Sequence, residues 1–217
     1  MHRCLIVLPA LLAAPLAGCV VGMANGEPYK EALRSSYTNF TRVDVSAGIE
    51  AVVSQGPFDV KGEIKHGENF DNLIVEVKGD TLHISRQMQL FGGGGPEYRV
   101  TVVAPAYRAF DVSSGASLDG ANLSLQDVDV SVSSGAHASL GGSCGKLDVD
   151  ISSGARFDGE SLKCGSAKVD ASSGASADAF ASQEADGSAS SGASVTFHGS
   201  PAQFHEDSSS GGSVSAR

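Results

Sequence analysis

The chain has 217 residues, of which 27 are glycine, 18% are charged and 6% are aromatic, and its formal net charge is −10. This acidity argues against nucleic acid as a partner, and the irregular spacing of the glycines excludes a collagen triple helix. The content of Leu, Ile, Val and Phe lies above that of a disordered chain, so we expect a folded domain.

Residues 1–18 have the features of an export signal. A short basic start precedes an apolar run over residues 4–17, which is too short to span a bilayer as a helix. Residues 16–19 read Leu-Ala-Gly-Cys and resemble the bacterial lipobox, in which the cysteine is lipidated and becomes the mature N-terminus. We therefore expect a signal peptide over residues 1–18 and a lipid anchor on Cys19. The alternative is an ordinary cleaved signal peptide followed by an incidental cysteine.

Residues 19–36 are expected to form a lipidated tether that leads into the domain. Val20 follows Cys19 in place of an aspartate, which by resemblance to Gram-negative lipoproteins implies export to the outer membrane. The acyl chains would supply the membrane affinity, because the acidic domain adds none. We expect a cell-envelope location, with the domain facing the periplasm or the cell surface.

Strand patterns run from residue 40 to residue 104. Alternating valines and isoleucines predict strands that are broken at Gly48 and at Gly56-Pro57. Residues 69–86 predict a hairpin-like pair of strands around Lys78-Gly79-Asp80. A further strand leads directly into the second half of the chain.

The second half of the chain is an internal repeat of 18–20 residues. The tetrapeptide Ser-Ser-Gly-Ala, degenerate in its last copy, starts at Ser113, Ser133, Ser152, Ser172, Ser190 and Ser209. Counted from the glycine of each copy, odd positions are mostly apolar and even positions are mostly polar, which is the pattern of a strand with one buried face. Strands of this kind bury their apolar residues when one coil stacks on the next.

The repeat therefore predicts an all-β fold, a parallel β-helix or solenoid with coils of about 18–20 residues from about residue 105 onward. A β-sandwich would not require the same residue types at a fixed phase. A disordered linker would not keep the apolar columns. The last coil is polar where earlier coils are apolar, which is typical of a cap; the residues that show this are Glu206, Ser208, Gly211 and Gly212.

The phase of the repeat places particular side chains over one another. Val130, Val149 and Val169 each stand five residues before a glycine and should form one buried column. Cys144 and Cys164 each lie eight residues before the next Ser-Ser-Gly, so they should face each other in neighbouring coils. We expect a disulfide between them, in an oxidising compartment. The alternative is two free, buried thiols.

The Ser-Ser-Gly corner has a structural explanation. Glycine adopts positive φ and lets adjacent coils approach closely, and stacked serine hydroxyls can donate and accept hydrogen bonds along a column. A nucleophilic serine needs a partnered histidine, and no histidine recurs beside this motif. The histidines also lack the spacing of zinc ligands. We expect no catalytic residue, no dedicated metal site and no cofactor.

Most of the negative charge falls after residue 110, and much of it lies in columns. Asp111, Asp150 and Asp170 share one outward column. One interpretation is a weak cation-binding wall, with Ca²⁺ the ion that stacked carboxylates suit. The other is a solvated wall that keeps the protein soluble. The lack of a dense Asp/Asn/Gly calcium loop favours the solvated wall.

The order of the motifs resembles that of the GIN-domain family of putative auto-transporter adhesin head domains. The resemblance covers about residues 37–217 and rests on matching residues in order along the chain: Phe40, Val43, Gly48, Gln55-Gly56, Asn72-Leu73, Thr81-Leu82, Val100, Val102, Pro105 and the Ser-Gly-Ala repeats. It implies a right-handed, single-stranded parallel β-helix over residues 37–217 and a cell-envelope location. It supplies no catalytic residues.

Together these observations predict a monomeric, non-enzymatic lipoprotein that adheres to or binds a glycan or an envelope protein. Two alternatives from other classes stay open. One is a β-helical carbohydrate-active enzyme that acts on envelope or acidic polysaccharide, which would show paired acids with a lysine or arginine on one wall. The other is an assembly unit that stacks end to end, against which the polar last coil argues.

Overall fold

The computed structural model describes residues 28–67, 69–87 and 96–217. The expected signal peptide over residues 1–18 and the expected lipid anchor at Cys19 lie outside these residues. Within them, no helix is both long enough and apolar enough to cross a membrane.

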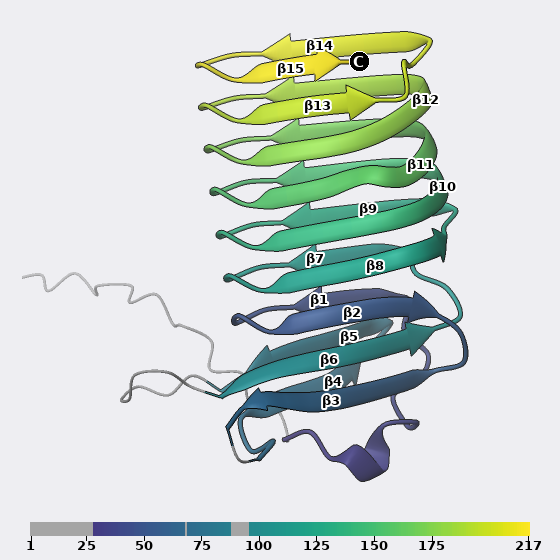
Figure 1. Ribbon diagram of the computed structural model, residues 1–217, viewed down its shortest axis with the longest axis vertical. Coiled ribbons are helices and arrows are strands. Elements are labelled where there is room, and N and C mark those ends of the chain that lie inside the picture. The colour runs from purple at the N-terminus through teal and green to yellow at the C-terminus, as the bar shows by residue number, and fades with distance from the viewer. Residues whose placement is uncertain (1–27, 68, 88–95) are drawn as a thin grey trace, which may run out of the picture.

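The described chain is an all-β, right-handed solenoid, flattened so that each coil contributes to two facing layers of strands (Figure 1). The layer at the back of Figure 1, here called the β1 layer, contains β1 (Arg42–Val45), β4 (Leu73–Lys78), β5 (Thr81–Arg86), β7 (Ala109–Val112), β9 (Asp127–Val132) and β14 (Gln203–Ser208). The layer at the front, the β2 layer, contains β2 (Glu50–Gln55), β3 (Asp59–His66), β6 (Glu97–Ala104), β8 (Ser117–Ser124), β13 (Ser194–His198) and β15 (Ser213–Ala216). Three long strands bend from the β2 layer into the β1 layer: β10 (His137–Ile151), β11 (Arg156–Ala171) and β12 (Ser176–Ala189).

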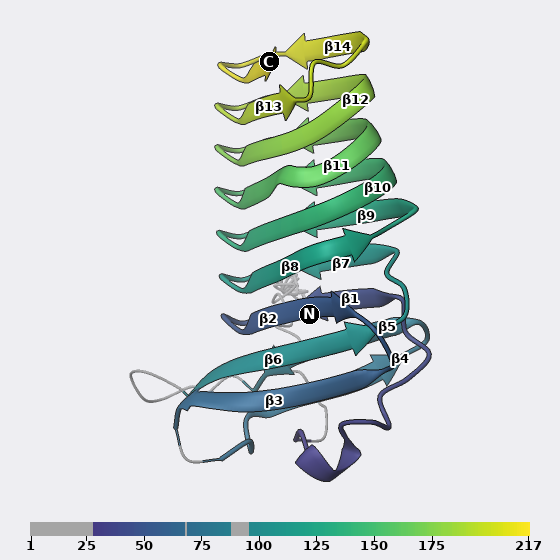
Figure 2. The same ribbon diagram turned by 45° about the vertical axis from the view of Figure 1, so that its right-hand side comes forward.

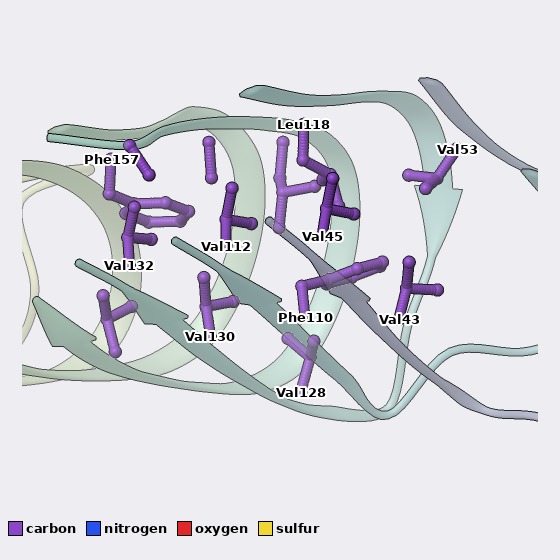
Figure 3. Close-up of a cluster of buried hydrophobic side chains, with 14 of the residues drawn as sticks. Val43, Val45, Val53, Phe110, Val112, Leu118, Val128, Val130, Val132 and Phe157 are labelled. Atoms are coloured by element: carbon purple, nitrogen blue, oxygen red, sulfur yellow. The ribbon is translucent and has the colours of Figure 1, made fainter. Parts of the chain in front are cut away.

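Equivalent side chains of successive coils stack in register between the two layers. Val130 pairs with Val149, and Val149 pairs with Val169; all three are at most 1% exposed. Figure 3 shows neighbouring columns, in which Val112 lies between Val45 and Val132. The parallel β-helix and its predicted buried column are therefore confirmed. Removal of these columns from water is the main stabilising term of the fold.

At each Ser-Ser-Gly corner the chain passes from the β1 layer to the β2 layer, and two successive residues have positive φ. In one corner, φ is 54° at Ser134 and 68° at Gly135, the combination found in type I′ turns, whose twist suits the strands they join. The amide of Gly135 donates to the carbonyl oxygen of Ser153 in the next coil at 3.1 Å. The positive φ expected for the glycine is confirmed. The serine before it shares this conformation, which is unfavourable for a residue with a Cβ and is repeated in every corner.

The first half of the chain does not stack in sequence order. β1 lies between β5 and β7, and β2 lies between β6 and β8. From β2 the chain descends to β3, forms the hairpin β4–β5 predicted around Lys78-Gly79-Asp80, and then climbs past its own first coil to reach β7 (Figure 2). β3 and β4 run antiparallel to β6 and β5. The base is thus a mixed sheet, a departure from the purely parallel stacking expected from residue 37.

A glutamine side chain closes the seam where β2 ends beneath β8. The Nε2 of Gln55 donates to the carbonyl oxygen of Ser124 at 3.0 Å, and its Oε1 accepts from the amide of Ser124 at 2.7 Å. The side-chain amide therefore takes the place of a backbone partner, so that both polar groups of Ser124 are satisfied.

Residues 28–36, expected as the end of the tether, are packed against the base. They include the 3-10 helix η1 (Glu31–Leu33). The ring of Tyr29 is 3% exposed, and a Cβ on Gly62 would come within 2.8 Å of that ring. The Tyr29 hydroxyl donates toward the carboxylate of Glu31 at 2.6 Å and lies 3.1 Å from the carbonyl oxygen of Val60. Burial, followed by the hydrogen bond to Glu31, raises the pKa of Tyr29.

Candidate functional site: a groove of serine and aspartate

A shallow groove with a volume of about 420 Å³ lies beside the Ser-Ser-Gly corners, on the outer face of the β1 layer. Val132, Ile151 and Ala171 from successive coils lie along its centre line. These residues point inward, so the groove follows the outward residues on either side of them. It runs across the strands, parallel to the solenoid axis.

Two columns of polar side chains form the walls of this groove. The column four residues before each glycine contains Ser131, Asp150, Asp170 and Ser188. The column two residues before each glycine contains Ser133, Ser152, Ser172 and Ser190. Because coils repeat about every 4.8 Å, the groove offers similar hydrogen-bonding groups at regular steps along one line.

The two carboxylates of the groove differ in their surroundings. Asp150 and Asp170 are register partners in neighbouring coils. The Oδ2 of Asp170 lies 2.9 Å from the Nζ of Lys168, and this hydrogen bond, strengthened by the charges of Asp170, Asp148 and Asp186, raises the pKa of Lys168. In the described chain Asp150 has no such cation partner. The groove therefore carries one carboxylate that is not neutralised by an ion pair.

Asp111, the third residue of the predicted wall, lies in the same column but below the groove. Ser131 separates it from Asp150, and its Oδ2 lies 3.7 Å from the guanidinium of Arg42. Arg42 reaches it only because β1 sits directly beneath β7, which the sequence pattern did not reveal. The structure thus brings together two of the three predicted acids and pairs the third with a cation.

The predicted cation wall stays a prediction. Among the described residues no group of three or more His, Cys, Asp or Glu side chains is arranged to hold a metal ion. The groove acids also lack the desolvated environment of a general acid. Asp150 is exposed and Asp170 is only partly buried. This arrangement suits hydrogen bonding and electrostatic attraction, which are the means of a binding surface.

Cys144 and Cys164 face each other in neighbouring coils, as their phase predicted. Their Cα atoms are 4.5 Å apart and their sulfurs are bonded. The pair lies on the edge of the solenoid opposite the corners, where β10 and β11 bend between the layers. It joins the coils that carry Asp150 and Asp170.

The groove itself was missed in the sequence. Its serines were assigned to the corner and its aspartates to a separate wall, although a fixed offset of two residues links them. The missing element was the geometry of the corner. The two residues with positive φ follow the first serine of each motif, so this serine still belongs to the β1 layer and lines one side of the groove.

A family model described as "Putative auto-transporter adhesin, head GIN domain" matches residues 39–201. The match covers the first coils and most of the repeat, including the whole groove. No curated protein matches the chain significantly.

Three solved structures are similar to the chain. A putative adhesin from Bacteroides fragilis NCTC 9343 superposes with a TM-score of 0.66 at 14% identity, over 83% of this chain and 93% of that one. A putative adhesin from Parabacteroides distasonis ATCC 8503 has a TM-score of 0.52 at 12% identity, over 83% and 93%. A putative lipid binding protein from the same strain has a TM-score of 0.49 at 16% identity, over 89% and 98%. At these identities the first two establish a shared fold, without residue roles.

Proposed function

The chain belongs to the family of putative auto-transporter adhesin head GIN domains, and on that premise we propose that it is a non-enzymatic, envelope-anchored binding protein. The observation that carries this proposal is the serine and aspartate groove, in which register-matched polar groups line up across successive coils. The description of the family as an adhesin head supports a binding role, and the first two structural neighbours are described as putative adhesins.

The groove favours a glycan chain as the ligand. Serine hydroxyls both donate and accept hydrogen bonds, and carboxylates accept them from sugar hydroxyls. A linear polymer in the groove would meet similar groups at each coil, so that weak contacts add along its length. The unpaired carboxylate of Asp150 favours neutral or amino-bearing sugars over acidic ones.

Binding of a glycan by the groove can be tested with one bulky substitution and a matched control. Ser152 lies in the corner column, and Ser152→Tyr would fill the groove without touching the core. Ser194 is an exposed serine on the opposite layer, and Ser194→Tyr makes the same chemical change away from the groove. On an array of envelope glycans we expect the unmodified domain and S194Y to bind the same sugars, and S152Y to lose them. Equal binding by S152Y and S194Y would exclude the groove.

The lipid anchor is the second part of this proposal. Pro28, the first described residue, forms a bridge to Ile74 of β4 at the base, and the C-terminus lies at the other end of the solenoid (Figure 1). Nine residues span at most about 30 Å, so a lipid on Cys19 would hold the base near the membrane. The coils that form the groove would then stand away from the bilayer.

Mass spectrometry tests this anchor directly. We expect protein extracted from membranes to begin at Cys19 and to carry a diacylglycerol adduct, and the Cys19→Ala variant to lack it. An unmodified Cys19 in the extracted protein would overturn the anchor. That outcome would leave the groove and its test untouched.

A further inference from the structure

A second pocket, with a volume of about 350 Å³, lies on the edge of the solenoid opposite the corners. It opens between two crossings of the chain, residues 105–108 and residues 124–127. In β10, β11 and β12 the corresponding crossings are parts of continuous strands. The lower crossing is irregular because the chain climbs past its own first coil here, from β6 to β7. The pocket is a product of this step.

The floor of the pocket is formed by two buried side chains. Tyr107 is 3% exposed and Leu125 is 5% exposed. The Tyr107 hydroxyl lies 2.9 Å from the carbonyl oxygen of Ser54 and 3.0 Å from that of Val102, which accept its hydrogen bond. Burial raises the pKa of Tyr107, so the hydroxyl stays protonated and keeps the crossing in place.

The rim carries side chains of both charges, and these form no ion pair with each other. Arg108 lines the pocket on one side, and Asp127 and Asp129 line it from the next crossing. Across the described residues, Arg108 is the one lysine or arginine whose side chain has no hydrogen bond, ion pair or ring contact. The side chains of Asp127 and Asp129 likewise have none. The opposite charges share one pocket without meeting in an ion pair.

From this arrangement we propose that the pocket binds a small zwitterion, whose anionic group pairs with Arg108 and whose ammonium group pairs with Asp127 and Asp129. A ligand with only negative charge would be repelled by the two carboxylates, and one with only positive charge would leave the guanidinium unused. The side-chain amide of Gln126 adds a donor and an acceptor on the same rim. Such chemistry occurs in a free amino acid or a very short peptide and in a phosphoethanolamine headgroup.

Titration of the ¹⁵N-labelled domain by NMR, with four probes, tests this site. The two zwitterions are glycylglycine and phosphoethanolamine. The two comparison probes carry charge of one sign only: ethanolamine is positive and inorganic phosphate is negative. We expect at least one zwitterion to shift the amides of residues 106–108 and 124–129, and to bind about fivefold more tightly than either counterpart, as one exposed ion pair allows. Preference for glycylglycine would assign a short peptide, and preference for phosphoethanolamine would assign a headgroup.

Two variants separate this site from general charge effects. Arg108→Ala removes the anion partner and should weaken the zwitterion about fivefold, to the affinity of ethanolamine. Arg156→Ala removes an exposed arginine on the other layer and should leave the affinity unchanged. Binding of the zwitterions no tighter than ethanolamine, or an undiminished affinity of R108A, would overturn the proposal. The result is independent of the glycan test, because S152Y does not alter this pocket.

Discussion

The two ends of the solenoid are closed by different physical means. At the base, antiparallel strands end the parallel stack, and Tyr29 packs against Phe70 with ring centroids 5.1 Å apart. At the other end, no further described strand covers β14 and β15, and every residue of β14 is exposed. There the column that contains Val169 continues to Gly187 and ends in Glu206. An inward-pointing charge of this kind blocks the pairing of an open edge.

This comparison shows that one end is stabilised by packing and the other is protected by charge. The buried aromatic base adds to the stability of the fold, whereas the polar last coil adds little, and we expect its charge to oppose association. The serine and aspartate groove and the pocket beside Arg108 both lie between the two ends.

The largest expected effect comes from removing the packed aromatic at the base. Tyr29→Ala should lower the free energy of unfolding by about 3–5 kcal/mol, because it leaves a cavity beside Gly62. Phe204→Ala removes an aromatic ring at the open end that is already 37% exposed, and should cost only about 1–2 kcal/mol. Urea denaturation measures both. Equal losses would contradict the contrast between the two ends.

The second-largest effect on the free energy of unfolding should come from removing the disulfide between Cys144 and Cys164 in the middle coils. It closes a loop of 20 residues, so replacing both cysteines with alanine should lower the free energy of unfolding by about 3 kcal/mol. Thiol titration of the unfolded, unreduced protein should find no reactive group at either cysteine. Two reactive thiols would show that the bond does not form in the native protein.

The protective charge at the open end can be removed by Glu206→Val. This variant extends the apolar column to the last coil, and we expect its self-association to strengthen about tenfold or more, equal to about 1.4 kcal/mol. Glu184→Val makes the same change at an outward, exposed position of β12 and should leave the protein monomeric. Sedimentation at increasing concentration measures both. If E206V and E184V associate alike, the charge of Glu206 is not what protects the end.

The smallest expected effect on stability comes from Glu50, which forms ion pairs with Lys65 and Arg99 near the base. Hydrogen bonds from Lys65 and Arg99 lower the pKa of Glu50, and Arg99 donates to it at 2.7 Å. A lowered pKa in the folded state stabilises the protein above the ordinary pKa of glutamate, and this contribution is lost as the pH falls through the lowered value. Glu50→Gln should therefore cost about 0.5–1 kcal/mol at neutral pH and nothing in strong acid.

A matched variant checks the acid dependence. Glu184→Gln removes an exposed carboxylate for which the described chain shows no ion pair. It should leave the free energy of unfolding unchanged at every pH. Thermal melts between neutral and acidic pH measure the difference. A cost of E50Q that grows as the pH falls would contradict the assignment.

The repeated coils could be predicted from the sequence because every coil presents the same pattern at the same phase. The register of the coils could be predicted from the spacing of Val130, Val149 and Val169. The same register predicted that Cys144 and Cys164 face each other. The order of the first coils could not be predicted in this way. A valine in β1 is equally apolar whether its neighbour is β5, β7 or both, so periodicity does not reveal that β1 lies between them.

The candidate site was predictable only in part for the same reason. The shared column of Asp150 and Asp170 follows from the repeat, but the groove also needs the first serine of each corner to lie on the same outer face. The pairing of Asp111 with Arg42 and the pocket beside Arg108 both arise where the chain passes its own first coil. Neither leaves a signal in the local pattern of residues.

Cross-linking across the groove tests the central claim, that residues one repeat apart lie directly over one another on the outer face. Parallel neighbours in register fall within disulfide range, as the Cα distance of 4.5 Å between Cys144 and Cys164 illustrates. We predict that the pair Asp150→Cys and Asp170→Cys forms a disulfide under mild oxidation, identified by mass spectrometry of the peptides. The pair Asp150→Cys and Ser188→Cys, two coils apart, should not. Efficient bonding of the second pair, or failure of the first in a folded protein, would contradict the stacked register on which the groove depends.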